Sequence, residues 1–275
     1  MNSITRKGRV SPQSTYGRGQ LALLTAFFAL VFLTILGCGA HSLEDLLNGG
    51  SSSSEAISSL PSSSSLSSSS SGNGGGSGSF TYQGQTYRTV VIGTQTWMAE
   101  NLNYDVSGSE CYDNKTENCT TYGRLYDWAT AMSLLSSCNL TSCSGQVSAK
   151  HKGICPSGWH IPSNADWDKL MRYADGTSGT DSPYDSPTAR RYLKAASGWV
   201  SDGNGTDAHG FSALPGGFGS SGVDFYNAGS GGYWWSSSEY QVSVAYLRLM
   251  HYYLAYGGCN HYYKGNLLSV RCLQD

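Results

Sequence analysis

The sequence predicts an α+β domain that follows an export signal and a flexible linker. Three observations support this organisation: an apolar run near the N-terminus ends at a cysteine, a Ser/Gly-rich stretch follows, and the remainder alternates strand-like and helix-like segments. Helical segments in the middle with strands at both ends are typical of an α+β fold, in which the two ends of the domain pair in one sheet.

The first 37 residues read as a secretory signal peptide. Four basic residues precede an apolar run over 21–36, which is shorter than the ~20 residues of a membrane-spanning helix. Ile35-Leu36-Gly37-Cys38 resembles the lipobox of bacterial lipoproteins, although that motif prefers Leu where Ile35 stands and Ala or Ser where Leu36 stands. We therefore expect lipidation of Cys38 and anchoring to a lipid bilayer; the alternative is an uncleaved N-terminal anchor. Gly39 rather than Asp after the cysteine favours the outer membrane.

Residues 38–79 are expected to form a tether. Residues 51–79 contain 17 Ser in 29 positions and almost no charge. Such a segment buries too little apolar surface to offset the entropy of ordering it. A Gly/Ser coil of this length reaches on average ~30 Å, which holds a domain away from a lipid surface.

Residues 80–275 form the predicted globular domain. After removal of the signal peptide the chain has 13 basic and 19 acidic residues, a formal charge of −6. Without a basic stripe, nucleic acid and anionic lipid are poor candidates as partners of the domain. The chain has 19 Tyr and 7 Trp against 7 Phe, and aromatic rings with a polar edge suit amphipathic surfaces as well as interiors.

The predicted elements follow from periodicity and punctuation. Short strands are expected at 80–82, 85–92 and 96–98, separated by Gly-containing turns. Helical spacing of apolar residues predicts a helix over 125–135, and Ser163 with Asp166 resembles a capping box for a helix over 164–174. A third helix is expected at 188–196. Beyond Phe211 the chain becomes β-like, with alternation over 242–250 and a closing strand over 268–273. Six tryptophans are expected mainly in the core: Trp97, Trp128, Trp159, Trp167, Trp234 and Trp235.

Cysteine usage agrees with export, because an oxidising compartment favours disulfides. The spacing suggests two local bridges and one long-range bridge, with Cys259 left as a free thiol; a bridge between Cys259 and Cys272 is the rival pairing. A zinc site is disfavoured because no C-x-x-C pair is present. The expected bridges are Cys111–Cys119, Cys138–Cys143 and Cys155–Cys272.

Six blocks of sequence resemble the Fibrobacter succinogenes major paralogous domain. They appear in order as Thr96-Trp-Met-Ala-Glu-Asn-Leu102, Tyr122-Gly-Arg-Leu-Tyr-Asp-Trp128, Cys155-Pro-Ser-Gly-Trp-His-Ile-Pro162, Gly210-Phe-Ser-Ala-Leu-Pro-Gly-Gly217, Tyr233-Trp-Trp-Ser-Ser-Ser-Glu239 and Ser269-Val-Arg-Cys272. Two of these blocks also resemble those of C-type-lectin-like domains. The resemblance implies a small antiparallel sheet, two to three short helices, long loops, adjacent termini and a bridge between Cys155 and Cys272.

The resemblance implies no metal chemistry or catalysis. The calcium-binding triplets of sugar-binding C-type lectins are missing from the sequence, as are the paired reactive cysteines of formylglycine-generating enzymes. The nearest cation-like pattern is Asp202, Asn204 and Asp207, whose spacing also suits plain turns. We therefore expect no cofactor, no metal and no catalytic residues. Carboxylates that could in principle serve hydrolysis are Glu100, Asp166, Asp168 and Glu239, and His160 is expected to be structural.

The aromatic-rich C-terminal segment is the best candidate for ligand contact. Sugar rings stack on aromatic faces, and their hydroxyls bond to Asn, His and Tyr side chains. The alternative is that about half of these tyrosines pack beneath the sheet. The candidate residues are Tyr252, Tyr253, Asn260, His261, Tyr262 and Tyr263.

These observations favour an exported, lipid-anchored surface protein whose domain binds carbohydrate or another surface ligand without catalysis. A structural component of the cell envelope without a glycan ligand is the first alternative. An enzyme of the formylglycine-generating-like branch is the second, and it is supported only by export and the fold resemblance.

Overall fold

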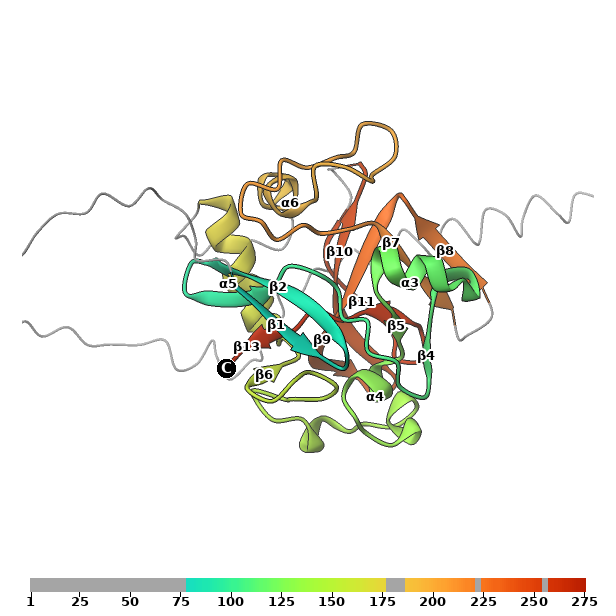
Figure 1. The fold of residues 1–275 in the computed structure, drawn as a ribbon. Helices are drawn as coiled ribbons and strands as arrows, with labels where there is room; N and C mark the ends of the chain where they lie inside the picture. The colour runs from blue at the N-terminus through green and yellow to red at the C-terminus, as the bar shows by residue number, and fades with distance from the viewer. Residues whose placement is uncertain (1–77, 177–185, 221–223, 254–256) are drawn as a thin grey trace, which may run out of the picture. The chain divides into compact units, whose positions relative to one another are not determined.

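The computed structural model describes residues 78–176, 186–220, 224–253 and 257–275 (Figure 1). The signal peptide, Cys38 and nearly all of the linker lie outside these residues, as does Tyr256. No helix in the described part of the chain is long and apolar enough to cross a membrane.

The domain is built on two sheets that are mostly antiparallel, as the α+β prediction requires. The five-stranded sheet has the order β1-β2-β3-β13-β6, and the path of the eight-stranded sheet runs β11-β10-β9-β12-β5-β4, with β7 and β8 attached beside β9. The first sheet consists of β1 (Gly78–Tyr82), β2 (Gln85–Ile92), β3 (Gln95–Met98), β6 (Trp159–His160) and β13 (Leu273–Gln274). The second consists of β4 (Ser109–Glu110), β5 (Leu125–Tyr126), β7 (Gly216–Ser220), β8 (Asp224–Ala228), β9 (Gly231–Gln241), β10 (Val244–His251), β11 (Gly257–Tyr263) and β12 (Leu268–Ser269).

The expected pairing of the two ends of the domain is confirmed. β3 pairs with β13 through Trp97 and Leu273, so N-terminal and C-terminal strands share the first sheet. The predicted closing strand is nevertheless divided. Leu268 pairs with Tyr126 in the second sheet, whereas Leu273 lies in the first sheet. One continuous strand could not serve both sheets, so the chain crosses from one to the other at 270–272.

Helices cover the sheets at several places. α5 (Asn164–Asp175) and α6 (Pro187–Leu193) pack against each other and, in Figure 1, lie on the β2 side of the domain. The capping box predicted for α5 is confirmed: the Ser163 hydroxyl accepts from the Asp166 N–H, and the Asp166 carboxylate accepts from the Ser163 N–H. The shorter helices are α3 (Thr116–Tyr122), α4 (Trp128–Ala131) and the 3-10 turns η1 (Tyr112–Asn114), η2 (Ser136–Asn139) and η3 (Ser144–Gln146).

The predicted helix over 125–135 is wrong in its first and last thirds. Leu125 and Tyr126 form strand β5, which pairs with β4 and β12. Only after Asp127, whose side chain caps the N–H of Thr130, does the chain become helical. The helix ends at Ala131, and Ser133 has a left-handed φ of 53°. Long-range strand pairing therefore overrides the local helical spacing here.

Trp234 and Trp235 divide the core into two clusters. Neighbouring residues on a strand point to opposite faces, so these two fully buried rings enter different clusters. Trp235 packs with Trp128 and Tyr87, whereas Trp234 packs with Trp97, Trp167 and Phe211. The six tryptophans predicted to be in the core are all buried.

The sequence blocks that carry the family resemblance meet at Asn101. Its side-chain oxygen accepts hydrogen bonds from Trp234 Nε1 at 2.8 Å and from Arg271 Nε and Nη2 at 3.1 and 2.8 Å. Its amide nitrogen donates to the Tyr122 carbonyl at 2.8 Å and to Ser269 Oγ at 3.3 Å. Four of the six blocks thus converge on one buried amide whose bonding capacity is filled. These motif residues support the fold.

Three predicted disulfides are confirmed, and they are Cys111–Cys119, Cys138–Cys143 and Cys155–Cys272. The expectation of a free thiol at Cys259 is wrong, because this cysteine is also disulfide-bonded. The rival Cys259–Cys272 pairing is contradicted too, since Cys272 bonds to Cys155.

Candidate functional site

The predicted tyrosine-rich segment lies on the hairpin of β10 and β11, at the edge of the second sheet. β11 pairs with β10 in the register Val244↔Tyr263, Ala245↔Tyr262 and Tyr246↔His261. Because side chains alternate between faces along a strand, His261 and Tyr263 share one face, and Asn260 and Tyr262 share the other. The structure therefore divides the predicted residues into two sets.

Tyr262 faces the core. Its ring lies 5.4 Å from Phe218 and 6.0 Å from Tyr233, both measured between ring centroids, and it packs against the cluster that contains Trp235. Asn260 uses its side-chain oxygen to accept the N–H of His261. The Tyr262 ring packs within the domain, and the Asn260 side chain makes a local hydrogen bond, so neither residue belongs to an exposed site.

Tyr252 and Tyr253 lie at the other end of the hairpin. Tyr252 is half-buried against the second core cluster and contacts the His251 ring at 4.5 Å. Tyr253 is 62% exposed. It follows the end of β10, whereas Tyr263 pairs with the first residue of that strand, so roughly 20 Å of strand separate them. The four predicted tyrosines do not form one site.

A partly exposed row of rings crosses three strands instead. Tyr240 on β9 stacks on His261 of β11 with centroids 4.2 Å apart, and it meets Tyr246 of β10 edge-on at 5.1 Å. Tyr263 stands on the same face of β11 as His261. Tyr240 is 41% exposed and Tyr263 68% exposed. We call Tyr240, Tyr246, His261 and Tyr263 the aromatic platform.

The aromatic platform continues a face that is otherwise covered by α5. Arg248, two residues after Tyr246 on the same face of β10, is buried and bonds to Asn164 and Asp168 of α5. Burial lowers the pKa of His261 from its ordinary value of 6.5, so its ring is neutral at pH 7. A neutral imidazole stacked on a phenol both donates and accepts hydrogen bonds at its edge. The platform can therefore offer flat apolar faces with polar edges.

The cation-like pattern forms turns. The Asn204 side-chain oxygen accepts the Trp199 N–H at 3.0 Å, and the Asp207 carboxylate accepts from the N–H and hydroxyl of Ser212 at 2.7 and 2.6 Å. Asp202 is exposed and has a left-handed φ of 56°. Across the described ranges, no group of three or more His, Cys, Asp and Glu side chains is placed to hold a metal ion.

Each of the four carboxylates considered for hydrolysis has a nearby cationic or histidine partner. Glu100 bonds to Arg88, Asp168 to Arg248 and Glu239 to Lys264. Asp166 lies 3.6 Å from Nε2 of His160.

His160 has the structural role that was expected of it. Its side chain is nearly fully buried, and its Nδ1 lies 2.7 Å from an oxygen of Asp275. Burial alone would lower the pKa of His160, but its contacts with Asp166 and Asp275 outweigh burial and raise it. This histidine joins the start of α5 to the last residue of the chain.

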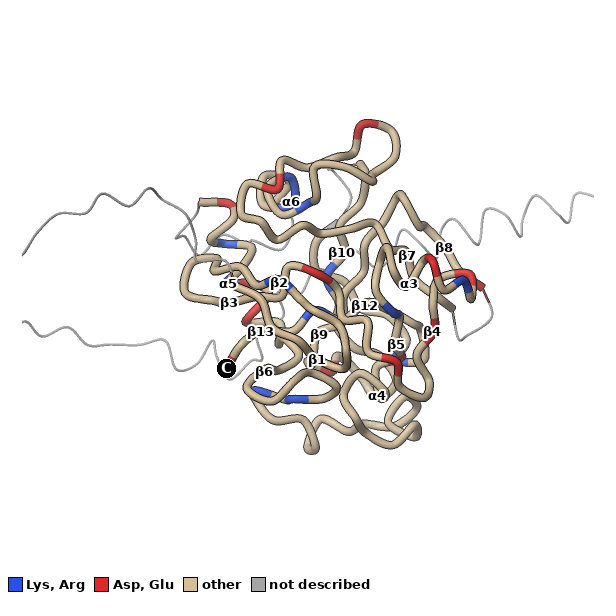
Figure 2. Tube along the Cα trace, viewed as in Figure 1, with Lys and Arg blue, Asp and Glu red and all other residues tan. Residues whose placement is uncertain are grey.

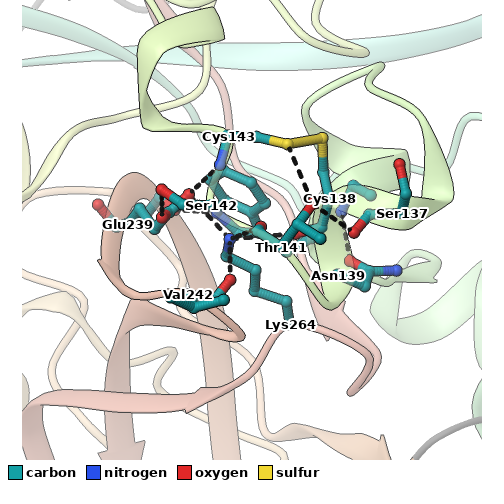
Figure 3. A network of polar contacts seen from close by, with 12 residues as sticks. Ser137, Cys138, Asn139, Thr141, Ser142, Cys143, Glu239, Val242 and Lys264 are labelled. Carbon is teal, nitrogen blue, oxygen red and sulfur yellow. Dashed lines mark hydrogen bonds and ion pairs between the residues drawn. A yellow bond between two sulfur atoms is a disulfide. The ribbon is translucent and has the colours of Figure 1, made fainter.

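A buried lysine organises the loop around the Cys138–Cys143 disulfide (Figure 3). Lys264 Nζ donates to Glu239 Oε2 at 2.8 Å and to the carbonyls of Val242, Cys138 and Thr141 at 2.9, 3.0 and 3.2 Å. The ammonium also lies 4.4 Å from the centroid of the Trp128 ring. Sequence reasoning missed the role of this lysine, because its acceptors come from two other segments of the chain.

Glu239 completes this network. Its two oxygens also accept the Ser142 hydroxyl at 2.6 Å and the Cys143 N–H at 2.9 Å. Burial alone would raise the pKa of Glu239, but the bonds from Lys264, Ser142 and Cys143 outweigh burial and lower it. The carboxylate is therefore charged at neutral pH, and Lys264 balances its charge.

Among the hollows on the surface of the described residues, two are relevant to ligand binding. One, of about 530 Å³, is lined by Asp113, Asn114, Lys115, Asp224, Phe225 and Tyr226. The other, of about 280 Å³, is lined by Ser144, Val147, Ser148, Ala149, Ser163, Ser237, Ser238 and Glu239. We call the second one the serine hollow. Figure 2 shows the basic and acidic positions of the described chain interspersed, without a basic stripe.

The sequence of the chain matches the model of one protein family. Residues 90–274 match the Fibrobacter succinogenes major domain, so the chain belongs to that family, as the sequence blocks predicted. No curated protein and no solved structure gives a significant match. The family carries no named activity that could be transferred to the aromatic platform or to either hollow.

Proposed function

We propose that this chain is an exported, lipid-anchored surface protein whose domain binds carbohydrate without catalysis. The observation that carries the proposal is the aromatic platform, a row of partly exposed rings across three strands at a sheet edge. Ring faces of this kind suit the C–H faces of sugars, and phenol and imidazole edges suit their hydroxyls. Two of the residues predicted for ligand contact, His261 and Tyr263, belong to it.

The proposed fold type is C-type-lectin-like. Two features support it: N-terminal and C-terminal strands share the first sheet, and Cys155, shortly before α5, bonds to Cys272 near the C-terminus. Both were expected from the resemblance of the sequence blocks.

The proposed anchor is a lipid on Cys38, with the Ser/Gly-rich linker as the tether. A lipid thioether would use the sulfur of Cys38. Mass spectrometry of the N-terminal peptide from membrane-extracted protein tests this anchor directly.

Affinity electrophoresis of the detergent-solubilised full chain against a panel of polysaccharides tests the binding proposal. Each exposed ring should contribute about 0.5–1.5 kcal/mol, so Tyr240→Ala and Tyr263→Ala should each weaken retardation by roughly two- to tenfold. Tyr253→Ala is the matched control for Tyr263→Ala, because the two rings are exposed to a similar extent but Tyr253 lies at the far end of the hairpin. A chelator should have no effect.

Two outcomes count against this proposal. If Tyr253→Ala weakens retardation as much as Tyr263→Ala does, the aromatic platform is not the binding surface. If no polymer in the panel retards the protein, a structural role in the cell envelope becomes the better interpretation.

A further inference from the structure

We propose that the serine hollow is a second, independent binding site, which takes a single uncharged sugar ring. The hollow lies between the segment 144–149, the start of α5 and the end of the Trp-Trp-Ser-Ser-Ser-Glu block. Its volume of about 280 Å³ lies just below the range of about 300–1,000 Å³ that is typical of small-molecule sites. This size suits one ring rather than an extended chain.

The hydroxyl groups of the hollow determine what kind of ligand it can take. Five of its eight lining residues are serines, and a hydroxyl can both donate and accept hydrogen bonds. Ser163 Oγ donates to the Asp166 carboxylate and accepts the Asp166 N–H, so its second lone pair remains for a ligand. Ser238 Oγ accepts the Asn164 N–H and retains its proton for donation. A ligand that matches both must itself donate and accept, as sugar hydroxyls do.

The charge of the hollow excludes strongly charged ligands. Glu239 is its only charged lining residue, and Lys264 Nζ lies 2.8 Å from the Glu239 carboxylate. Lys264 is itself fully buried and does not line the hollow. An anionic sugar would therefore find no free cation, and a cationic sugar would compete with Lys264 for a carboxylate that already has its partners.

The wall of the hollow is held in place before any ligand arrives. The segment 144–149 follows directly after the Cys138–Cys143 disulfide. Glu239 bonds to Ser142 and to the Cys143 N–H, and Lys264 bonds to carbonyls on the same loop (Figure 3). A site whose wall is already ordered loses less entropy on binding. Val147 and Ala149 add apolar surface for the C–H groups of a ring.

Saturation-transfer-difference NMR on the full-length protein in detergent micelles tests this site. The probes are glucose, galactose, mannose and xylose, the methyl glycosides of the first three, and the charged sugars glucuronate and glucosamine. We expect saturation of one or more uncharged sugars and none of the charged ones. Binding of a methyl glycoside would identify the end of a glycan chain as the ligand, whereas binding of the free sugar alone would indicate a free monosaccharide.

Variants locate the signal. Ala149→Trp should fill the hollow and abolish saturation, while Gln146→Trp, on the same exposed segment but outside the lining, should retain it. If Ala149→Trp lowers the melting temperature, Ser148→Trp provides a second way to fill the hollow. Tyr253→Ala should leave saturation unchanged, because Tyr253 is exposed and lies outside both the hollow and the aromatic platform.

Three results would overturn the proposal. They are the absence of saturation for every uncharged sugar, saturation that persists in both filled variants, and saturation of glucuronate or glucosamine as strong as that of the uncharged sugars. Because polysaccharide retardation is measured separately with the platform variants, failure of this site and failure of the aromatic platform give different patterns.

Discussion

Lys264→Met should destabilise the domain strongly. The ammonium is fully buried and donates to one carboxylate and three carbonyls. Methionine has similar length and no donor, so Glu239 would remain as a buried charge with two neutral donors. Removing one partner of a buried ion pair costs about 3–5 kcal/mol. For a domain of this size that loss corresponds to a fall in melting temperature of roughly 6–20 °C.

Urea unfolding of the full chain measures this loss. The matched control is Lys152→Met, which removes an exposed ammonium and should change the free energy of unfolding by less than about 0.5 kcal/mol. A loss below about 1 kcal/mol for Lys264→Met would refute the reasoning. It would mean that water or a rearranged loop satisfies the four oxygens without the lysine.

A conservative substitution of Glu239, the partner of Lys264, tests how the stability of the domain depends on pH. Glu239→Gln keeps the shape and leaves the three carbonyls their donor, so it should cost less than Lys264→Met. The pKa of Glu239 is lowered in the folded state, so its contribution is present above the ordinary carboxyl value of 4.5. The contribution is lost as the pH falls through the folded value. The stability gap between wild type and Glu239→Gln should therefore narrow below pH 4.5.

Three further predictions follow from other contacts. The pKa of His160 is raised in the folded state, so the contribution of His160 to stability is present below pH 6.5 and is lost as the pH rises through the folded value. In urea unfolding, the difference in the free energy of unfolding between wild type and His160→Gln should therefore narrow as the pH rises. A difference that stays constant would contradict this. Cys155→Ser removes the disulfide to Cys272, which closes a loop of 117 residues, and should lower the free energy of unfolding by about 4–5 kcal/mol, measured by calorimetry. A decrease below about 1 kcal/mol would argue against the entropic explanation of this disulfide's effect. Cys38→Ala should abolish labelling by a fatty-acid analogue and release the protein from membranes; unchanged labelling would remove the lipoprotein interpretation.

Local signals predicted some elements accurately. The strand over 85–92 is observed with the bounds expected from alternation, and α5 begins after Ser163 as its capping box indicates. Both depend on residues close together in the sequence. By contrast, whether Leu125 continues a helix or starts a strand is decided by Ser269, which lies far along the chain. Sequence periodicity carries no information about such a partner.

The same limit explains the outcome for the tyrosines. A dense group such as Tyr262 and Tyr263 can be recognised in the sequence, but only the pairing with β10 shows that the first faces the core and the second faces solvent. Tyr240 and Tyr246 were missed because each belongs to a different strand from His261. The alternation of residues along β10 places Tyr246 on the same face of the strand as Arg248. This spacing was the one signal in the sequence that could have indicated where the Tyr246 side chain lies.

Family membership and the aromatic platform involve different parts of this domain. The blocks that identify the family converge on Asn101 and bury its partners Trp234 and Arg271, so their physical role is to join the sheets. Tyr263 of the aromatic platform lies outside those blocks, on an exposed edge where substitution costs little folding energy. A chain can therefore keep the buried polar centre while its platform residues change. It follows that the family assignment predicts the fold, and that a ligand of the aromatic platform has to be sought from the surface side chains of each member.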